Sequence, residues 1–199
     1  VLHGCTHRVI GDRIVCATYL CAAAAAGGEV RLTGVDYRAV STVALSLAES
    51  GCEVRSEADA VSLRSTGALR SVRPVRTAPY PGFPTDAQPV LMAALLRSEG
   101  CTVFVENIFE NRYRHVDELS RMGAEIRVVG RVAVVNGVRT LHGAAVKCTD
   151  LRGGAALVIA GLSAEGTTRV TELTHIDRGY DAIERDLAAL GAQIRRETT

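Results

Sequence analysis

Ser50-Gly51-Cys52-Glu53-Val54 is the first of three similar phrases in this sequence, followed by Met122-Gly123-Ala124-Glu125-Ile126 and Leu190-Gly191-Ala192-Gln193-Ile194. The glycine of each phrase stands 23, 23 or 25 residues after an earlier glycine, at Gly28, Gly100 and Gly166. Those glycines stand 16, 14 and 16 residues after Asp12, Asp86 and Asp150. Such a period indicates one supersecondary unit stacked on copies of itself, because a single unit cannot bury its apolar face alone. We therefore expect one domain over residues 1–199, with units at about 6–66, 71–138 and 144–199.

The first element of each unit is expected to be a buried helix. Residues 14–26, 90–96 and 155–162 are apolar on nearly every side, and a helix without a polar face cannot lie on a solvated surface. The second element is expected to be a half-exposed helix, because apolar residues recur there at helical spacing among charged ones. These residues are Val40, Val43, Ala44 and Leu47, then Val116, Leu119 and Met122, then Tyr180, Ile183, Leu187 and Leu190.

Strands are expected around these helices. Between the two helices of each unit, alternation predicts a strand with one buried face. Its inward residues are expected to be Val30 and Leu32, Val103 and Val105, and Val170 with Leu173. Short strands are expected at 8–10, 72–76 and 145–148, and hairpins at 52–63 and at 126–138, which contains Asn136-Gly137. Unit three stops after residues 194–196, so the last strand of its hairpin is expected to come from elsewhere.

The unit is therefore βαβαββ. Three such units, with their inner helices buried together and their sheets outside, predict a single α/β domain with pseudo-threefold symmetry.

Composition argues against several classes of protein. The chain has a formal net charge of +1, is 4% aromatic and has no basic tract, which argues against a nucleic-acid surface. Its longest apolar run, near residues 14–26, contains Thr18 and is too short to cross a bilayer. The six cysteines lack CxxC spacing and the histidines are scattered, so no metal site, cofactor or disulfide framework is indicated. The chain opens at Val1 without a methionine or signal-like segment, and we expect a piece of a longer, cytoplasmic protein.

Two kinds of polar residue stand where helices are expected to begin. Asp86 and Asp150 suit helix N-caps, because a carboxylate accepts hydrogen bonds from the free amides of the first turn. The same helix ends attract anions, and on one side of the domain they would form an anion-binding rim. Arg112 and Arg178 stand at strand-to-helix turns, where a guanidinium can be solvated, ion-paired or directed at a phosphate or carboxylate.

Several phrases from units two and three carry a more specific signal. They are Arg76-Thr77-Ala78-Pro79, Gly82-Phe83-Pro84-Thr85-Asp86, Phe109-Glu110-Asn111-Arg112, Leu119-Ser120-Arg121-Met122-Gly123-Ala124, Asp150-Leu151-Arg152, Ala164-Glu165-Gly166-Thr167-Thr168 and His175-Ile176-Asp177-Arg178-Gly179-Tyr180. With these phrases, in this order along nearly the whole chain, the sequence resembles the UDP-N-acetylglucosamine 1-carboxyvinyltransferase family.

The resemblance implies both a fold and an activity. The family's fold is two inside-out α/β barrel-like domains, each of three βαβαββ repeats around three buried inner helices, with the active site between the domains. This chain is similar to the C-terminal domain, so the N-terminal domain is an implied partner. The implied reaction moves the enolpyruvyl group of phosphoenolpyruvate to the 3′-hydroxyl of UDP-N-acetylglucosamine and releases phosphate, at the first committed step of peptidoglycan precursor synthesis.

The resemblance also implies roles for individual residues. Asp86 matches a carboxylate beside the reacting sugar hydroxyl, a candidate general base, and Asp150 matches a second active-site carboxylate. Arg152 and Arg178 are similar to the arginines that hold the carboxylate and phosphate of phosphoenolpyruvate. The remaining implied substrate contacts are Thr85, the backbone of Ile108, and Arg112.

The sequence departs from the family in two places. Ala87 stands where a methionine is usual, and residues 12–17 lack a glutamate and glycine often found there. The family's loop with its proton donor and its lysine-asparagine pair lie outside these residues, so the isolated chain is expected to be inactive. Two alternatives are a shikimate-pathway enolpyruvyl transferase and a non-catalytic or RNA-handling protein of the same repeat, as in RNA 3′-terminal phosphate cyclases.

Overall fold

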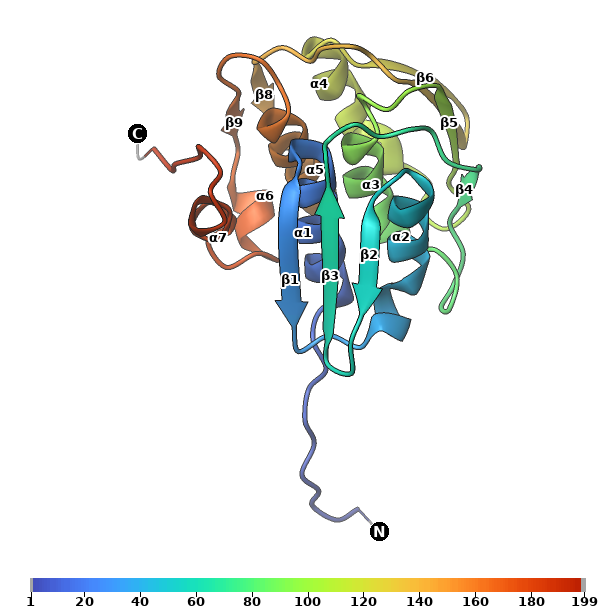
Figure 1. Ribbon diagram of the computed structural model, residues 1–199, viewed down its shortest axis with the longest axis vertical. Helices are drawn as coiled ribbons and strands as arrows, with labels where there is room; N and C mark the ends of the chain where they lie inside the picture. The colour runs from blue at the N-terminus through green and yellow to red at the C-terminus, as the bar shows by residue number, and fades with distance from the viewer. Residues whose placement is uncertain (1, 198–199) are drawn as a thin grey trace.

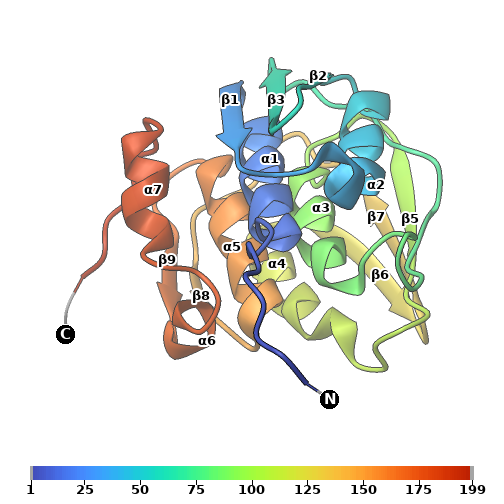
Figure 2. The ribbon, with the colours of Figure 1, turned by 90° about the horizontal axis from the view of Figure 1, so that it is seen from below.

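The computed structural model describes residues 2–197 and shows an α/β fold built around three inner helices. These are α1 (Arg13–Ala26), α3 (Gln88–Ala94) and α5 (Leu151–Leu162), and each contacts the other two. Figure 2 shows them side by side, with the sheets around them. Every residue of α3 is buried, as are most residues of α1 and α5, which confirms the three predicted buried helices.

The outer helices are α2 (Tyr37–Glu49), α4 (Val116–Arg121), α6 (Thr174–Asp177) and α7 (Ile183–Ala189), with two short 3-10 turns, η1 (Thr85–Ala87) and η2 (Arg112–His115). The buried residues of α2 are the four predicted from its apolar stripe. The apolar stripe predicted for the second helix of unit three is wrong at Leu190, which is 57% exposed. Helix α7 ends at Ala189, and Leu190 lies beyond it at the edge of a groove in the surface.

The strands form three separate sheets (Figure 1). The first has the order β1-β3-β2 and is antiparallel: β1 (Gly28–Thr33), β2 (Glu53–Ser56), β3 (Ala60–Ser65). The second has the order β4-β5-β7-β6, and only its β4–β5 pair is parallel: β4 (Val75–Arg76), β5 (Cys101–Val105), β6 (Glu125–Val129), β7 (Val132–Asn136). The third is the parallel pair β8 (Ala145–Lys147) and β9 (Arg169–Thr171).

One backbone property explains the six glycines that mark the repeat, Gly28, Gly51, Gly100, Gly123, Gly166 and Gly191. All six have positive φ, between 87° and 123°, a region that side chains other than glycine rarely enter. After α2, α4 and α7 the backbone makes the same pair of hydrogen bonds: Gly51, Gly123 and Gly191 donate to the third residue before them, and the following residue donates to the fifth before it. This is the Schellman motif, in which a left-handed glycine ends the helix.

The full order βαβαββ occurs in unit two, whereas units one and three depart from it within the described residues. The strand predicted at 8–10 is absent: Val9 and Ile10 are 82% and 79% exposed, because this segment extends away from β1 and meets no strand (Figure 1). In unit three no strand follows α7, and Leu173 lies at the start of α6 rather than in β9.

In strand β5 the alternation of buried and exposed residues is shifted by one residue from the prediction. Thr102 and Phe104 are buried, whereas Val103 and Val105 are only half-buried. A threonine can occupy this buried position because its hydroxyl accepts a hydrogen bond from the Val72 amide at 3.2 Å. The predicted inward valines are therefore wrong, although the strand itself is confirmed.

Candidate functional site

The site is built where the inner helices begin. Asp150 is the N-cap of α5 and accepts hydrogen bonds from the amides of Arg152 and Gly153 at 3.0 and 2.9 Å, which confirms the predicted cap. Asp12 caps α1 in the same way. Asp86 lies inside η1, just before α3, and makes no capping bond. The N-cap reading of Asp86 is therefore wrong, because its carboxylate is turned toward side chains instead of backbone amides.

Asp86 binds two arginines from different units. Its Oδ1 accepts a hydrogen bond from Nη2 of Arg112 at 2.8 Å, and its Oδ2 lies 3.4 Å from Nε of Arg152. Nε of Arg112 donates to the hydroxyl of Thr85 at 3.1 Å. The two arginine side chains are 7% and 13% exposed and that of Asp86 is 41% exposed, so the guanidinium groups are buried behind a carboxylate that faces solvent.

The loop after β5 is held from beneath by a buried carboxylate. Oε1 of Glu106, which is 1% exposed, accepts hydrogen bonds from the amides of Ile108 and Phe109, both at 2.9 Å, and from the Thr77 hydroxyl at 2.8 Å. Ile108 and Phe109 are thereby kept on the surface at 44% and 50% exposure. The Phe109 ring centre lies 4.4 Å from Cζ of Arg112, so the loop also packs against the arginine that binds Asp86.

Arg178 lies outside this cluster. It follows α6 and is exposed, and its side chain makes no hydrogen bond or ion pair with any residue that the structure describes. Its neighbour Gly179 packs against the side chain of Leu151 at the start of α5, where a Cβ would lie 2.9 Å from Cδ2. Of the predicted site residues, the structure thus joins Thr85, Asp86, Arg112 and Arg152, and leaves the side chain of Arg178 outside the cluster.

Sequence reasoning missed several residues of the site. Glu106 and Phe109 support the loop, and Tyr180 and Thr18 form a hydrogen-bond chain with Arg152. Tyr180 belongs to a phrase that resembled the family, which was a signal, but its apolar spacing pointed only to the core. Thr18 interrupts an apolar helix, and a buried hydroxyl in such a helix needs a partner.

His115 lies beneath the site and is fully buried. Its Nδ1 lies 3.1 Å from the backbone carbonyl of Arg112, which can only accept, so Nδ1 carries the proton. Within residues 2–197, Nε2 has no hydrogen-bond partner. Burial lowers the pKa of His115 to about 4, although the nearby carboxylate of Asp150 acts in the opposite direction.

The pKa of His115 predicts a pH-dependent stability. The pKa of this histidine is near 6.5 in the unfolded chain and about 4 in the folded one. The free energy of unfolding is therefore unaffected by the titration of His115 above pH 6.5 and decreases as pH falls toward 4, by up to about 3 kcal/mol. Urea unfolding between pH 7 and 4.5 measures this loss. In His115→Asn the amide can replace Nδ1 as donor and does not titrate, so its loss should be smaller. Equal losses in both proteins would contradict the assignment.

Two further searches of the part of the chain that the structure describes are negative. No group of three or more histidine, cysteine, aspartate or glutamate residues there could hold a metal ion. No helix there is long and apolar enough to span a membrane.

The buried guanidinium of Arg112 and the half-buried one of Arg152 meet at Asp86 near the N-terminal ends of inner helices, in an α/β domain. Guanidinium groups and helix N-termini are the groups with which proteins bind anions. The sequence profile of the family described as EPSP synthase (3-phosphoshikimate 1-carboxyvinyltransferase) matches residues 1–187, and the chain belongs to this family.

Curated relatives match along almost the whole chain. A protein named UDP-N-acetylglucosamine 1-carboxyvinyltransferase from Gluconacetobacter diazotrophicus is 52% identical over 98% of this chain, which spans 46% of that protein. One of the same name from Desulfofundulus thermocisternus is 52% identical over 98% of this chain and 80% of its own length. The chain thus spans about half the length of the first relative.

Solved structures agree on the fold. The enolpyruvyl transferase NikO from Streptomyces tendae is 30% identical, with a TM-score of 0.82 over 94% of this chain and 44% of that one. An EPSP synthase from Acinetobacter baumannii, 22% identical with a TM-score of 0.74 over 96% of this chain and 45% of that one, shows the likeness of the fold alone.

Proposed function

We propose that this chain is one domain of an enzyme that transfers the enolpyruvyl group of phosphoenolpyruvate to the 3′-hydroxyl of UDP-N-acetylglucosamine. The observation that carries the proposal is the ion pairing of Arg112 and Arg152 with Asp86, in a chain 52% identical to proteins named for this activity. The hydroxyl oxygen adds to C2 while a proton adds to C3. Phosphate then leaves C2 as C3 loses a proton, which restores the double bond.

Asp86 is proposed to accept the hydroxyl proton. In the present structure its oxygens are bound by Arg112 and Arg152. Phosphate and carboxylate groups of the substrates would compete for the same guanidinium groups, because arginine binds such anions through paired N–H groups. Substrate binding would thereby release Asp86 from its ion pairs as the reacting hydroxyl arrives.

The other predicted residues are proposed to bind substrate. Arg178, whose exposed side chain has no partner within residues 2–197, is suited to join Arg152 in holding phosphoenolpyruvate. Thr85 and the exposed Ile108 border the Asp86 cluster and would contact the nucleotide sugar. Asp150 would act as the second carboxylate from its place at the start of α5.

The family description favours one alternative acceptor, shikimate 3-phosphate. The names of the relatives at 52% identity favour UDP-N-acetylglucosamine, whereas the EPSP synthase structure is only 22% identical. Phosphate release by the complete protein, with phosphoenolpyruvate and each acceptor in turn, separates the two. Release with shikimate 3-phosphate alone would overturn the proposal. The relatives and structures named above are all named for enolpyruvyl or carboxyvinyl transfer or for EPSP synthase, which favours a transferase over the RNA-handling alternative.

The 199-residue chain by itself is expected to release no phosphate from the two substrates. The proposed site lies between two domains, and a cleft open on one side lacks the proton donor and cannot exclude water. A coupled phosphate-release assay on the purified chain measures this. Sustained release that requires both substrates would show that the chain already holds the whole site.

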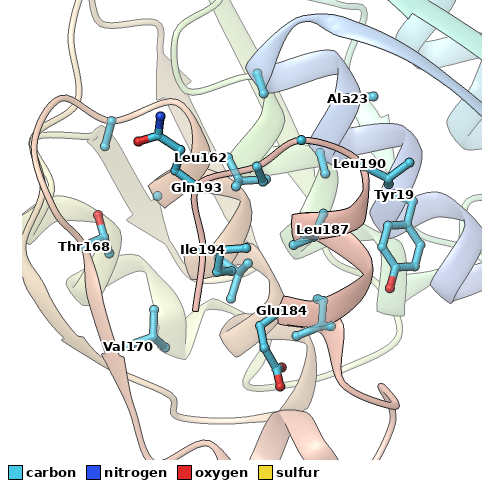
Figure 3. Close-up of a pocket in the computed structure, with 18 of the residues that line it drawn as sticks. Tyr19, Ala23, Leu162, Thr168, Val170, Glu184, Leu187, Leu190, Gln193 and Ile194 are labelled. Carbon is cyan, nitrogen blue, oxygen red and sulfur yellow. The ribbon is translucent and has the colours of Figure 1, made fainter. Parts of the chain in front are cut away.

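We also propose that residues 1–199 form a single domain of three units related by pseudo-threefold symmetry. Unit two has the full order βαβαββ, and the rest of the protein is proposed to supply the strands that unit three lacks. A groove of about 630 Å³ lies beside β9 (Figure 3). Most of the residues that line it are apolar, and they come mainly from α1, β1, α5, β9 and α7. They include Tyr19 and Ala23 of α1, Leu162 of α5, Val170 of β9 and Leu187 of α7.

Two strand edges border this groove. In unit two β5 pairs with β4 and β7, but within residues 2–197 its counterpart β9 pairs only with β8. β1, whose residues also line the groove, is the edge strand of its own sheet. A groove of mixed polar and apolar surface between two open edges fits an extended segment of the same polypeptide better than a small ligand, because added strands would satisfy both edges.

The open edge of β9 is expected to exchange its amide hydrogens quickly in the isolated chain. Arg169 donates to Ala144 and the Thr171 carbonyl accepts from Cys148, so the backbone groups of Val170 face away from β8. Hydrogen exchange at Val170 should be on the order of 100-fold faster than in β5, which has strands on both sides. Strong protection of the Val170 amide in a monomer would contradict the open edge.

The site of action is proposed to be the cytoplasm. All six cysteines are free thiols in the structure. Free thiols fit a reducing compartment, and the step proposed here belongs to the synthesis of a peptidoglycan precursor.

A further inference from the structure

A chain of hydrogen bonds runs from α1 to Arg152 and is not used by the reaction proposed above. The Thr18 hydroxyl donates to the Ile14 carbonyl at 2.8 Å and also lies 2.8 Å from the Tyr180 hydroxyl. Nη1 of Arg152 lies 3.3 Å from the same tyrosine oxygen. Arginine can only donate, so Tyr180 accepts from Arg152. The single proton of Thr18 is used on Ile14, so Tyr180 donates to Thr18.

The chain is closed to solvent. Thr18 is 1% exposed and Tyr180 is 4% exposed. Burial raises the pKa of Tyr180, so its hydroxyl keeps its proton at neutral pH. A buried hydroxyl with one donor and one acceptor partner is fully satisfied, and such a network holds its members in one arrangement.

The free N–H groups of Arg152 show what the arrangement achieves. An arginine has about five N–H donors. Nε is directed at Asp86 and one Nη1 hydrogen at Tyr180, and the remaining N–H groups have no partner within residues 2–197. The Tyr180 ring also lies beneath the guanidinium, its centre 5.7 Å from Cζ. The protein thus holds one face of the Arg152 guanidinium plane and two of its N–H groups, and the remaining N–H groups are free to bind a ligand.

We propose that Tyr180, supported by Thr18, is the positioning residue that orients the Arg152 guanidinium for the anionic groups of phosphoenolpyruvate. This rests on the proposed function only for the identity of the anion. The orientation itself rests on contacts between two units, since Thr18 lies in α1 of unit one, whereas Arg152 in α5 and Tyr180 between α6 and α7 belong to unit three.

Tyr180→Phe tests the proposal, with Tyr19→Phe as the matched control. Both changes remove one hydrogen-bonded phenolic hydroxyl from a side chain that is largely buried, because Tyr19 is 9% exposed and its hydroxyl donates to Asp186 at 2.9 Å. Tyr19, however, lines the groove beside β9 and makes no hydrogen bond to Arg152. Phe keeps the ring beneath Arg152, so only the two hydrogen bonds of the Tyr180 hydroxyl, with Arg152 and Thr18, are lost.

In the complete protein, Tyr180→Phe should raise KM for phosphoenolpyruvate about 10-fold, the scale for one hydrogen bond to a charged group. The KM for UDP-N-acetylglucosamine should stay within about twofold, and kcat should change much less than KM. Thr18→Val should raise the same KM less. Tyr19→Phe should lower Tm about as much as Tyr180→Phe without changing either KM. Equal KM values for phosphoenolpyruvate in the two tyrosine variants would overturn the proposal.

A second measurement separates this inference from the proposed function. In the 199-residue chain, hydrogen exchange at Nε–H of Arg152, followed by NMR, should be faster in Tyr180→Phe and unchanged in Tyr19→Phe. If the complete protein does not use phosphoenolpyruvate but this difference is found, the proposed function is wrong and the positioning of Arg152 stands. Unchanged exchange in both variants would overturn the positioning role itself.

Discussion

Asp86→Asn in the complete protein is expected to lower turnover by a factor of about 100 or more, the scale of a lost general base. Asparagine keeps the shape of the side chain and an oxygen to accept from Arg112, which donates to Oδ1 at 2.8 Å. It loses the negative charge and the second acceptor oxygen, Oδ2, which lies 3.4 Å from Nε of Arg152. UDP-N-acetylglucosamine should therefore still bind while the transfer slows.

Steady-state kinetics and calorimetric binding of the nucleotide sugar measure the two effects separately. Asp12→Asn is the matched control, because Asp12 stands at the same place in unit one and only caps α1. Asparagine caps helices about as well as aspartate, so this variant should keep its turnover. If Asp86→Asn also kept near-normal turnover, Asp86 would be an anchor for the two arginines and not the base.

Gly137→Ala is expected to destabilise the fold by about 3 kcal/mol or more, the upper range for overpacking. A Cβ on Gly137 would lie 1.5 Å from the carbonyl oxygen of Ser98, and Ser98 is itself buried. The backbone here is fixed on both sides, because Gly137 donates to the Gly100 carbonyl and Val138 to that of Leu96. The end of β7 would have to move away from the turn after α3.

Urea unfolding at pH 7 measures this loss, and Gly130→Ala provides the control. Gly130 forms the turn between β6 and β7 with a φ of 58°, and nothing lies within 4 Å of a Cβ built there. An alanine there should cost only about 1 kcal/mol, from its backbone conformation. Similar losses in the two variants would show that the close approach at Ser98 is not what requires a glycine.

These two glycines show how far sequence reasoning reached. The hairpin over 126–138 is confirmed. The Asn136-Gly137 pair, a sequence typical of turns, ends β7 instead, and the turn is at Gly130. Nothing in the local sequence records that Gly137 is pressed against Ser98, because that contact depends on how β7 meets the turn after α3.

Features set by neighbours along the chain were determined by the sequence. Gly51, Gly123 and Gly191 end α2, α4 and α7 because the Schellman motif needs a residue with left-handed backbone conformation just after the last turn of the helix. The apolar stripe of α2 identified its buried face because helical periodicity is a local property. The three inner helices followed from their lack of a polar face.

The tertiary structure alone decided which polar side chains meet. Asp86 and Arg152 are 66 residues apart in the sequence, and Thr18 and Tyr180 are 162 apart. An aspartate at a helix start suits a cap and an ion pair equally well, so the sequence alone could not distinguish Asp150, which caps α5, from Asp86, which binds two arginines. Stacking of the three units brings these residues within hydrogen-bonding distance, and the spacing within any one unit carries no record of that stacking.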